Sequence, residues 1–158
     1  MLLLIYCVGK ERYGLDSNQI IEVVPQVILK PLPHAPDYVA GLFNYRGNIV
    51  PVVDLCALIG SAPCEPLLST RIILVEYPGA DGEQHVLGLL AERVTETLNC
   101  NEEDFNPPGI TVPGDAYLGD VFVDGEGMVQ RIRIDAILPE SLRRSLFVAV
   151  EENVDALH

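Results

Sequence analysis

The chain offers three histidines as candidate general acids or bases: His34, His85 and His158. A general base needs a nucleophile or a water within reach, and usually a third group that orients it. No GxSxG, HExxH, P-loop or GxGxxG sequence accompanies these histidines. We therefore predict ordinary surface histidines and no enzymatic activity, and a hydrolase that uses His34 or His85 is the less favoured alternative.

Cysteines are common metal ligands, but none of the four in this chain forms a CxxC pair: Cys7, Cys56, Cys64 and Cys100. A zinc site made of Cys56, Cys64 and His34 is conceivable, but the spacing is not that of a structural zinc motif. We expect the cysteines of a chain in a reducing compartment to be small buried apolar residues or incidental free thiols.

Acidic residues flank one predicted turn, namely Asp120, Asp124 and Glu126. Their spacing lacks the alternating ligands of a calcium-binding loop. A solvated turn is the favoured interpretation, so the sequence predicts neither a metal site nor a cofactor.

The charge of the chain limits its partners. Ten basic and 23 acidic residues give a net charge of −13, and no cluster of lysine or arginine stands out. Such a chain is repelled by phosphate backbones and anionic membranes. The N-terminal segment has no basic region before its apolar run, and no run approaches the ~18 apolar residues that span a bilayer. We predict a cytoplasmic protein that binds no nucleic acid and does not insert into a membrane.

One arginine remains unexplained. Arg46 lies within the largely aliphatic stretch GLFNYRGNIVPVVDL (41–55), beside Tyr45 and Gly47. Arg46 could pair with an acid and hold a hairpin together. It could instead anchor another protein, because arginine and tyrosine are enriched at the energetic centres of interfaces. The sequence alone leaves both interpretations open.

The elements that position Arg46 are predicted to be short strands. Leu, Ile and Val dominate the core candidates, and 13 Gly and 12 Pro supply turns. Gly47-Asn48 is the predicted hairpin turn, Asp54 is the predicted cap of a helix that Gly60 ends, and residues 37–41 are expected to form a helical turn. The other predicted strands and hairpins cover 2–8, 12–16, 71–77, 85–98 (with a bend at Gly88) and 117–135, followed by a helix capped by Asp135.

The two halves of the chain repeat a pattern. Residues 42–58 and 121–138 each read as strand, Gly turn, strand, capping Asp and short helix. The repetition fits two small barrels made by one chain. Glu126 stands in the second turn where Arg46 stands in the first, so a turn of this kind does not require arginine.

The stretch 41–55 resembles the signature of the CheW-like family of chemotaxis coupling proteins, which reads Gly, hydrophobic, x, Asn, Leu, Arg, Gly, then a hydrophobic-Pro-hydrophobic-hydrophobic-Asp-Leu segment. RYGLDSNQIIEVV, VLGLLAERVTETL and the closing hairpin and helix are similar to further segments of this family. The resemblance covers about residues 2–140.

The resemblance implies an all-β fold with short helices, made of two interlocked five-stranded SH3-like barrels. It implies one domain over 1–147, with two sub-barrels that share one core, followed by an acidic tail over 148–158. It also implies a non-catalytic scaffold that couples the cytoplasmic tips of chemoreceptors to the regulatory domain of a CheA-type histidine kinase, within membrane-associated chemoreceptor arrays. The implied partner-binding residues are Arg46, Asn44, Gly47, Tyr45, Ile20, Glu22, Val86 and Leu87.

Two departures from the family pattern point to a paralogue. Tyr45 replaces the usual Leu, and Val24 stands where flagellar members carry an arginine. The stimulus, the receptor, the kinase and the role of the acidic loop 99–115 do not follow from the sequence. A small-molecule sensor that uses the groove between the barrels, and a detached regulatory module of a kinase, are the alternatives.

Overall fold

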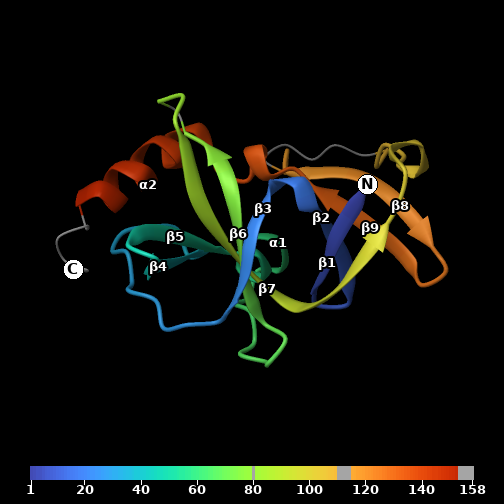
Figure 1. The fold of residues 1–158 in the computed structure, drawn as a ribbon, viewed down its shortest axis with the longest axis horizontal. Helices are drawn as coiled ribbons and strands as arrows, with labels where there is room; N and C mark the ends of the chain where they lie inside the picture. The colour runs from blue at the N-terminus through green and yellow to red at the C-terminus, as the bar shows by residue number, and fades with distance from the viewer. Residues whose placement is uncertain (80, 110–114, 153–158) are drawn as a thin grey trace.

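The computed structural model describes residues 1–79, 81–109 and 115–152, with the backbone alone for residues 148–152. Within this part of the chain, nine strands form one continuous sheet system (Figure 1). The strands are β1 (Leu2–Val8), β2 (Glu11–Asp16), β3 (Ile20–Pro25), β4 (Val39–Tyr45), β5 (Asn48–Asp54), β6 (Arg71–Pro78), β7 (Gln84–Asn99), β8 (Leu118–Asp124) and β9 (Gly127–Ile132).

Strand β7 is long enough to serve two barrels. Its first part pairs with β6 and β5, and its second part pairs with β1. One half of the molecule therefore contains β3, β4, β5, β6 and the start of β7, and the other contains β1, β2, β8, β9 and the end of β7. This arrangement confirms the predicted fold of two interlocked five-stranded barrels, which lie side by side along the long axis in Figure 1.

An aliphatic core joins the two halves. The largest cluster of buried side chains includes Tyr6 and Leu15 from one barrel and Val53 and Leu89 from the other. Two smaller clusters fill the individual barrels, one around Leu3 and one around Val52. Burial of this much aliphatic surface is the main driving force for folding. It also joins the two barrels through one shared core.

Short helices close the barrels, and one of them follows the predicted capping pattern. Helix α1 (Leu55–Gly60) begins after Asp54, whose Oδ1 accepts a hydrogen bond of 3.1 Å from the amide of Ala57. The 3₁₀ turns are η1 (Ser17–Gln19), η2 (Glu102–Asp104) and η3 (Ile134–Ala136), and the last helix is α2 (Glu140–Glu152). Asp16 caps η1 by accepting a hydrogen bond from the Asn18 amide.

The helical turn predicted over residues 37–41 is wrong. Val39 begins β4, because it pairs with Val53 of β5. Gly41 has φ +143, and a Cβ there would lie 2.5 Å from the carbonyl oxygen of Lys30. The glycine therefore permits a close backbone approach within a strand and does not end a helix.

Two further local predictions are corrected. Gly88 sits in regular register opposite Leu74, and the irregularity of β7 falls instead near Arg93, which has φ 51. Asp135 lies inside η3, whose cap residue is Arg133, and α2 starts only at Glu140. Gly88 pairs with Leu74 of β6 on one side and Val52 of β5 on the other, so β7 continues through it in register. Pro139 separates η3 from α2.

The predicted acidic tail, 148–158, and the acidic loop, 99–115, are described only in part. Helix α2 continues through Glu152, beyond the predicted boundary at residue 147. Residues 153–158 and 110–114 lie outside the described residues. In the part of the loop that is described, Phe105 is buried and Asn106 forms a bridge with Val121, so this part packs on the second barrel.

Candidate partner-binding site

The turn between β4 and β5 presents Arg46 on the surface. Arg46 and Gly47 are its two central residues, with φ 51 and φ 87, and Tyr45 pairs with Asn48 across it. The turn thus falls one residue earlier than the predicted Gly47-Asn48, with both central residues in the left-handed region. Arginine seldom adopts that conformation, and the turn is supported by the Asn44 Oδ1 atom, which accepts a hydrogen bond of 2.8 Å from the Gly47 amide.

Arg46, Tyr45 and Glu22 form a small surface group, which we call the Arg46 cluster. Arg46 Nη2 lies 3.2 Å from Oε2 and 3.3 Å from Oε1 of Glu22. The guanidinium carbon also stands 5.2 Å from the centre of the Tyr45 ring, within cation–π range. The Tyr45 hydroxyl donates a hydrogen bond to Glu22 Oε2, and this bond raises the pKa of the Tyr45 phenol. The cluster joins the hairpin to β3.

The exposure of the Arg46 cluster bears on whether Arg46 holds the hairpin together or anchors another protein. The Arg46 side chain is 73% exposed and that of Glu22 is 35% exposed. An ion pair this open to solvent contributes only about 0–1 kcal/mol to folding. Arg46 does pair with an acid, as one interpretation expected, but most of its side-chain surface remains exposed to another molecule, as the other interpretation required.

The three apolar residues expected at the site lie on two faces of the β3–β6–β7 sheet. Val86 packs, with Tyr45, against the cluster of the first barrel, and is half-buried. Ile20 packs against the large shared core and is also half-buried. Leu87 is fully buried in that core, so its side chain cannot touch a partner in this conformation. Leu87 holds β7 in place, and the structure corrects its expected position in an open groove.

In the part of the chain that the structure describes, the contacts of His85 are with a carboxylate and an aromatic ring and not with a nucleophile. His85 Nε2 lies 3.2 Å from Asp81 Oδ1, and its ring stacks on Phe147 of α2 at 4.2 Å between ring centres. His34 has φ 66 and belongs to the loop between β3 and β4, while His158 lies outside the described residues. His85 therefore helps to dock α2 on the β6–β7 hairpin, a packing role that the sequence did not indicate.

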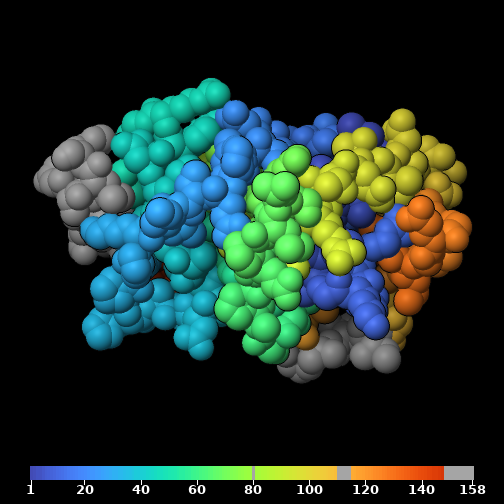
Figure 2. Space-filling view, turned by 90° about the horizontal axis from the view of Figure 1, so that it is seen from below, coloured from blue at the N-terminus to red at the C-terminus, as the bar shows by residue number. Residues whose placement is uncertain are grey.

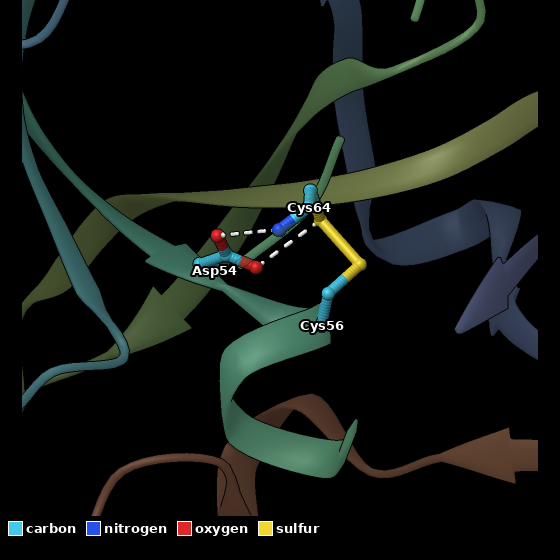
Figure 3. A group of neighbouring side chains, drawn as sticks. All are labelled: Asp54, Cys56 and Cys64. Carbon is cyan, nitrogen blue, oxygen red and sulfur yellow. Dashed lines mark hydrogen bonds between the residues drawn. A yellow bond between two sulfur atoms is a disulfide. The ribbon is translucent and has the colours of Figure 1, made fainter. Parts of the chain in front are cut away.

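Cys56 and Cys64 form a disulfide, which corrects the expectation of incidental thiols. Cys64 lies beside the first turn of α1, where its sulfur is bonded to that of Cys56, as Figure 3 shows. Cys7 and Cys100 are free. One carboxylate oxygen of Asp54 and the sulfurs of Cys56 and Cys64 lie within 4.8 Å of one another, close enough to be metal ligands. The two sulfurs are bonded to each other, however, and both Asp54 oxygens accept hydrogen bonds from backbone amides. These atoms are therefore engaged in other bonds in this structure.

Among the described helices, none combines the length and the apolar character that crossing a bilayer would require.

Comparison with known proteins agrees with this architecture. The family model of the CheW-like domain matches residues 2–142. The chain is similar to the chemotaxis protein CheW of Rhizobium meliloti (strain 1021), with 27% identity over 146 residues that cover 90% of each chain. It is also 27% identical to the chemotaxis protein CheW of Klebsiella aerogenes, over 85% of this chain and 80% of the relative.

A solved structure shows the same fold. The crystal structure of the scaffolding protein TtCheW from Thermoanaerobacter tengcongensis superposes with a TM-score of 0.77, at 27% identity, and 87% of each chain is covered. Together with the shared β7, the double barrel and the match over residues 2–142, these likenesses place the chain: it belongs to the CheW-like family.

Proposed function

We propose that this protein is a non-catalytic scaffold that couples chemoreceptors to a CheA-type histidine kinase in a bacterial chemosensory pathway. The observation that carries the proposal is the exposed Arg46 cluster on a rigid double barrel of the CheW-like family. Curated relatives carry the name of chemotaxis proteins, and the solved neighbour is called a scaffolding protein. A scaffold of this kind acts in the cytoplasm, at the inner side of a membrane that holds the receptors.

The Arg46 cluster is the proposed contact with the kinase regulatory domain. An exposed guanidinium can donate several hydrogen bonds in a plane, and the adjacent Tyr45 ring offers flat apolar area. Glu22 holds both side chains, so that little side-chain freedom is lost on binding. Asn44 and Gly47 contribute by shaping the turn, and do not need to touch the partner.

The receptor tip is proposed to bind beside β7, near Val86, which is half-buried and leaves part of an apolar side chain at the surface. Ile20 is also half-buried but lies on the other face of the sheet, and is proposed as a separate partner contact on β3. Amphipathic helices bind such surfaces through their apolar face. Weak contacts of this kind gain strength when they are repeated in an array. We further propose that residues 1–147 act as one unit in this assembly.

Reconstitution tests the proposal. The purified protein is mixed with the CheA-type kinase and the cytoplasmic fragment of a receptor from the same genome, and autophosphorylation of the kinase is measured. We expect the receptor fragment to change kinase activity only when the scaffold is present, and the three proteins to sediment together. Receptor control of the kinase that is equally strong without the scaffold would contradict the proposal.

The alternative of a small-molecule sensor has no support among the relatives, whose names refer to chemotaxis and scaffolding. A shift in melting temperature with a metabolite, in the absence of any association with the kinase or the receptor, would favour it.

A further inference from the structure

The segment between α1 and β6 (residues 61–70), which we call the linker, is held to the barrel at few points. From Ser61 to Leu68 every residue is exposed except Cys64, which is half-buried. The side chain of Leu68 is fully exposed. In Figure 2 the green atoms of the linker stand at the centre of the face that points down in Figure 1. Cys64 is therefore the anchor of an otherwise exposed segment.

Two bonds of Cys64 fix this anchor. Its sulfur is bonded to that of Cys56, in the first turn of α1, across a sequence separation of 8 residues. Its amide donates a hydrogen bond of 3.0 Å to Asp54 Oδ2, at the end of β5. Next to Cys64, the Glu65 amide donates a longer hydrogen bond of 3.5 Å to Glu92 Oε1, and Thr70 Oγ1 donates to the Glu65 carbonyl at 2.6 Å. At the far end of the linker, the Val94 amide donates to the Ser69 carbonyl at 2.9 Å. Loss of the disulfide would leave the middle of the linker held to the barrel by the amide hydrogen bonds of Cys64 and Glu65.

The surroundings of the sulfurs also suit the reduced state. Cys64 Sγ lies 3.1 Å from Asp54 Oδ1 and 3.5 Å from the Leu90 carbonyl oxygen (Figure 3). Cys56 Sγ lies 3.5 Å from Glu92 Oε1. Each S–H that reduction creates therefore has an acceptor in place, so neither thiol would be buried without a hydrogen-bond partner. The site can hold a disulfide or two thiols with little rearrangement.

The two cysteines differ in their access to solvent. The residue Cys56 is 4% exposed, whereas Cys64 is half-buried in an exposed segment. Thiol–disulfide exchange requires the attacking thiolate to reach one sulfur of the bond in line with it. Attack on Cys64 is thus the open route.

We propose that Cys56 and Cys64 form a thiol–disulfide exchange site that takes a small thiol and controls the attachment of the linker. The thiolate of one small thiol attacks Cys64 Sγ and forms a mixed disulfide. The electron pair of the broken bond leaves on Cys56 Sγ, which takes a proton from water, and the new S–H donates a hydrogen bond to Glu92. The thiolate of a second small thiol then attacks the small-molecule sulfur of the mixed disulfide. Cys64 leaves as a thiolate, takes a proton from water and donates a hydrogen bond to Asp54. The sum is one protein disulfide and two thiols converted into a protein dithiol and one small-molecule disulfide.

Redox-dependent attachment of the linker is a property that the scaffold function does not require. Oxidation fastens the linker, with the exposed Leu67 and Leu68, to α1 and β5. Reduction releases the sulfur bond and lets the linker open locally. The attachment of the linker would then depend on the concentrations of small thiols and disulfides around the protein.

The oxidation state is measured directly on the full chain. The protein is purified without reductant, denatured, alkylated with N-ethylmaleimide and analysed by peptide mass mapping. We expect alkylation of Cys7 and Cys100 only, with a linked Cys56–Cys64 peptide, and alkylation of all four cysteines after dithiothreitol. Four alkylated cysteines without dithiothreitol would overturn the proposal, and so would one zinc ion per chain released by a chelator.

The route of attack has its own test. In the Cys56→Ser variant, glutathione disulfide should modify Cys64, and in Cys64→Ser it should modify Cys56 at least tenfold more slowly. Equal rates at the two positions would overturn the assignment of Cys64 as the attacked sulfur. Cys100→Ser, which removes a free and buried thiol, serves as the control and should behave like the parent chain.

Hydrogen exchange tests the effect on the linker. We expect amides of residues 61–69 to exchange at least fivefold faster after dithiothreitol, and the melting temperature to fall by roughly 5 °C. The Cys56→Ser and Cys64→Ser variants should match the reduced parent and lose the response, while Cys7→Ser keeps it. An unchanged linker after reduction, or a response that persists in Cys56→Ser, would contradict the proposal.

Discussion

Two hairpin turns of this molecule each lie beside a guanidinium–carboxylate pair, and they expose it to very different degrees. At the β4–β5 turn, Arg46 is 73% exposed and its partner Glu22 is 35% exposed. At the β8–β9 turn, Arg12 of β2 is 15% exposed and Asp124 is 17% exposed. Arg12 donates from Nη1 and Nη2 to the two oxygens of Asp124, at 2.8 and 2.9 Å.

The difference separates a structural pair from an available one. A bidentate ion pair that is shielded from water is strong, and removal of one partner leaves the other charge buried without compensation. An exposed pair with longer contacts contributes little to folding. We infer that Arg12 holds the second turn to β2 for stability, whereas Arg46 is free to serve a partner. On this inference, the same hairpin pattern stabilises one barrel and offers a contact to a partner on the other.

The largest effect is expected at Arg12. Arg12→Met should lower the free energy of unfolding by about 2–3 kcal/mol, because it leaves Asp124 without its partner. Arg46→Met should cost less than about 1 kcal/mol. Urea denaturation at neutral pH measures both. Equal losses would remove the contrast between the two turns.

The second effect is a pH dependence at the Arg12 pair. The hydrogen bonds from Arg12 lower the pKa of Asp124 to about 2. In the unfolded chain the pKa of an aspartate is about 3.9. A lowered pKa in the folded state stabilises the protein above the unfolded value, and this stabilisation is lost as the pH falls from about 4 to 2, at a size of about 1–2 kcal/mol.

The Asp124→Asn variant isolates this contribution. Its deficit in unfolding free energy relative to the parent should be largest near pH 6 and should shrink toward pH 2. Glu126→Gln is the control, because Glu126 is 73% exposed and stands 3.8 Å from Arg12. A deficit of Asp124→Asn that stays constant over this pH range would show that the ionised pair is not its source.

A smaller effect is expected at the glycine of the first turn. Gly47 has φ 87 and open space around it, so Gly47→Ala should cost about 1 kcal/mol through backbone strain alone. Gly125 in the second turn has the same open space without a positive φ, and Gly125→Ala should change stability by less than about 0.5 kcal/mol. Thermal unfolding of the two variants compares them. A larger loss for Gly125→Ala would contradict the assigned turn geometry.

The smallest effect is expected for the hydroxyl of Tyr45. Tyr45→Phe removes the hydrogen bond to Glu22 but keeps the ring near Phe43, at 6.3 Å between ring centres. We expect the smallest loss of unfolding free energy in this series, because the group is close to solvent. Urea denaturation of this variant, beside Tyr77→Phe, whose buried hydroxyl donates to the Asp135 carbonyl, checks it. A loss as large as that of Arg12→Met would mean that the Arg46 cluster is structural.

The elements of the fold could largely be predicted, because their signals are local. Asp54 caps α1 and the helix ends at Gly60 as expected, since a capping carboxylate acts within one turn of chain, although the left-handed residue after the helix is Ser61, with φ 73. The failed predictions concern tertiary contacts. Residues 37–41 look helical in isolation, yet β5 draws Val39 into a strand. The turn was predicted at Gly47-Asn48, one residue after its observed place at Arg46-Gly47, because arginine rarely adopts a positive φ.

The site could be predicted only in part. Arg46 stands out in the sequence because it is a charged residue in an apolar stretch, and Glu22 was expected at the same face through the family resemblance. Nothing local indicates that Glu22 meets Arg46, because 24 residues and a change of strand separate them. Nothing local shows that Leu87 faces the core or that Cys64 returns to Cys56. Such contacts depend on the register of β7 and on the path of the linker.

The central claim, that Arg46 serves a partner more than it serves the fold, is tested most directly by binding affinity. Isothermal titration calorimetry measures the Kd for the regulatory domain of the CheA-type kinase with the parent chain, with Arg46→Glu and with Arg144→Glu. Arg144 is the matched control, since it is 75% exposed and also pairs with one glutamate. We predict a Kd at least tenfold weaker for Arg46→Glu, an unchanged Kd for Arg144→Glu, and melting temperatures within a few degrees of the parent for both. A parent-like Kd together with a clearly lower melting temperature for Arg46→Glu would contradict the claim.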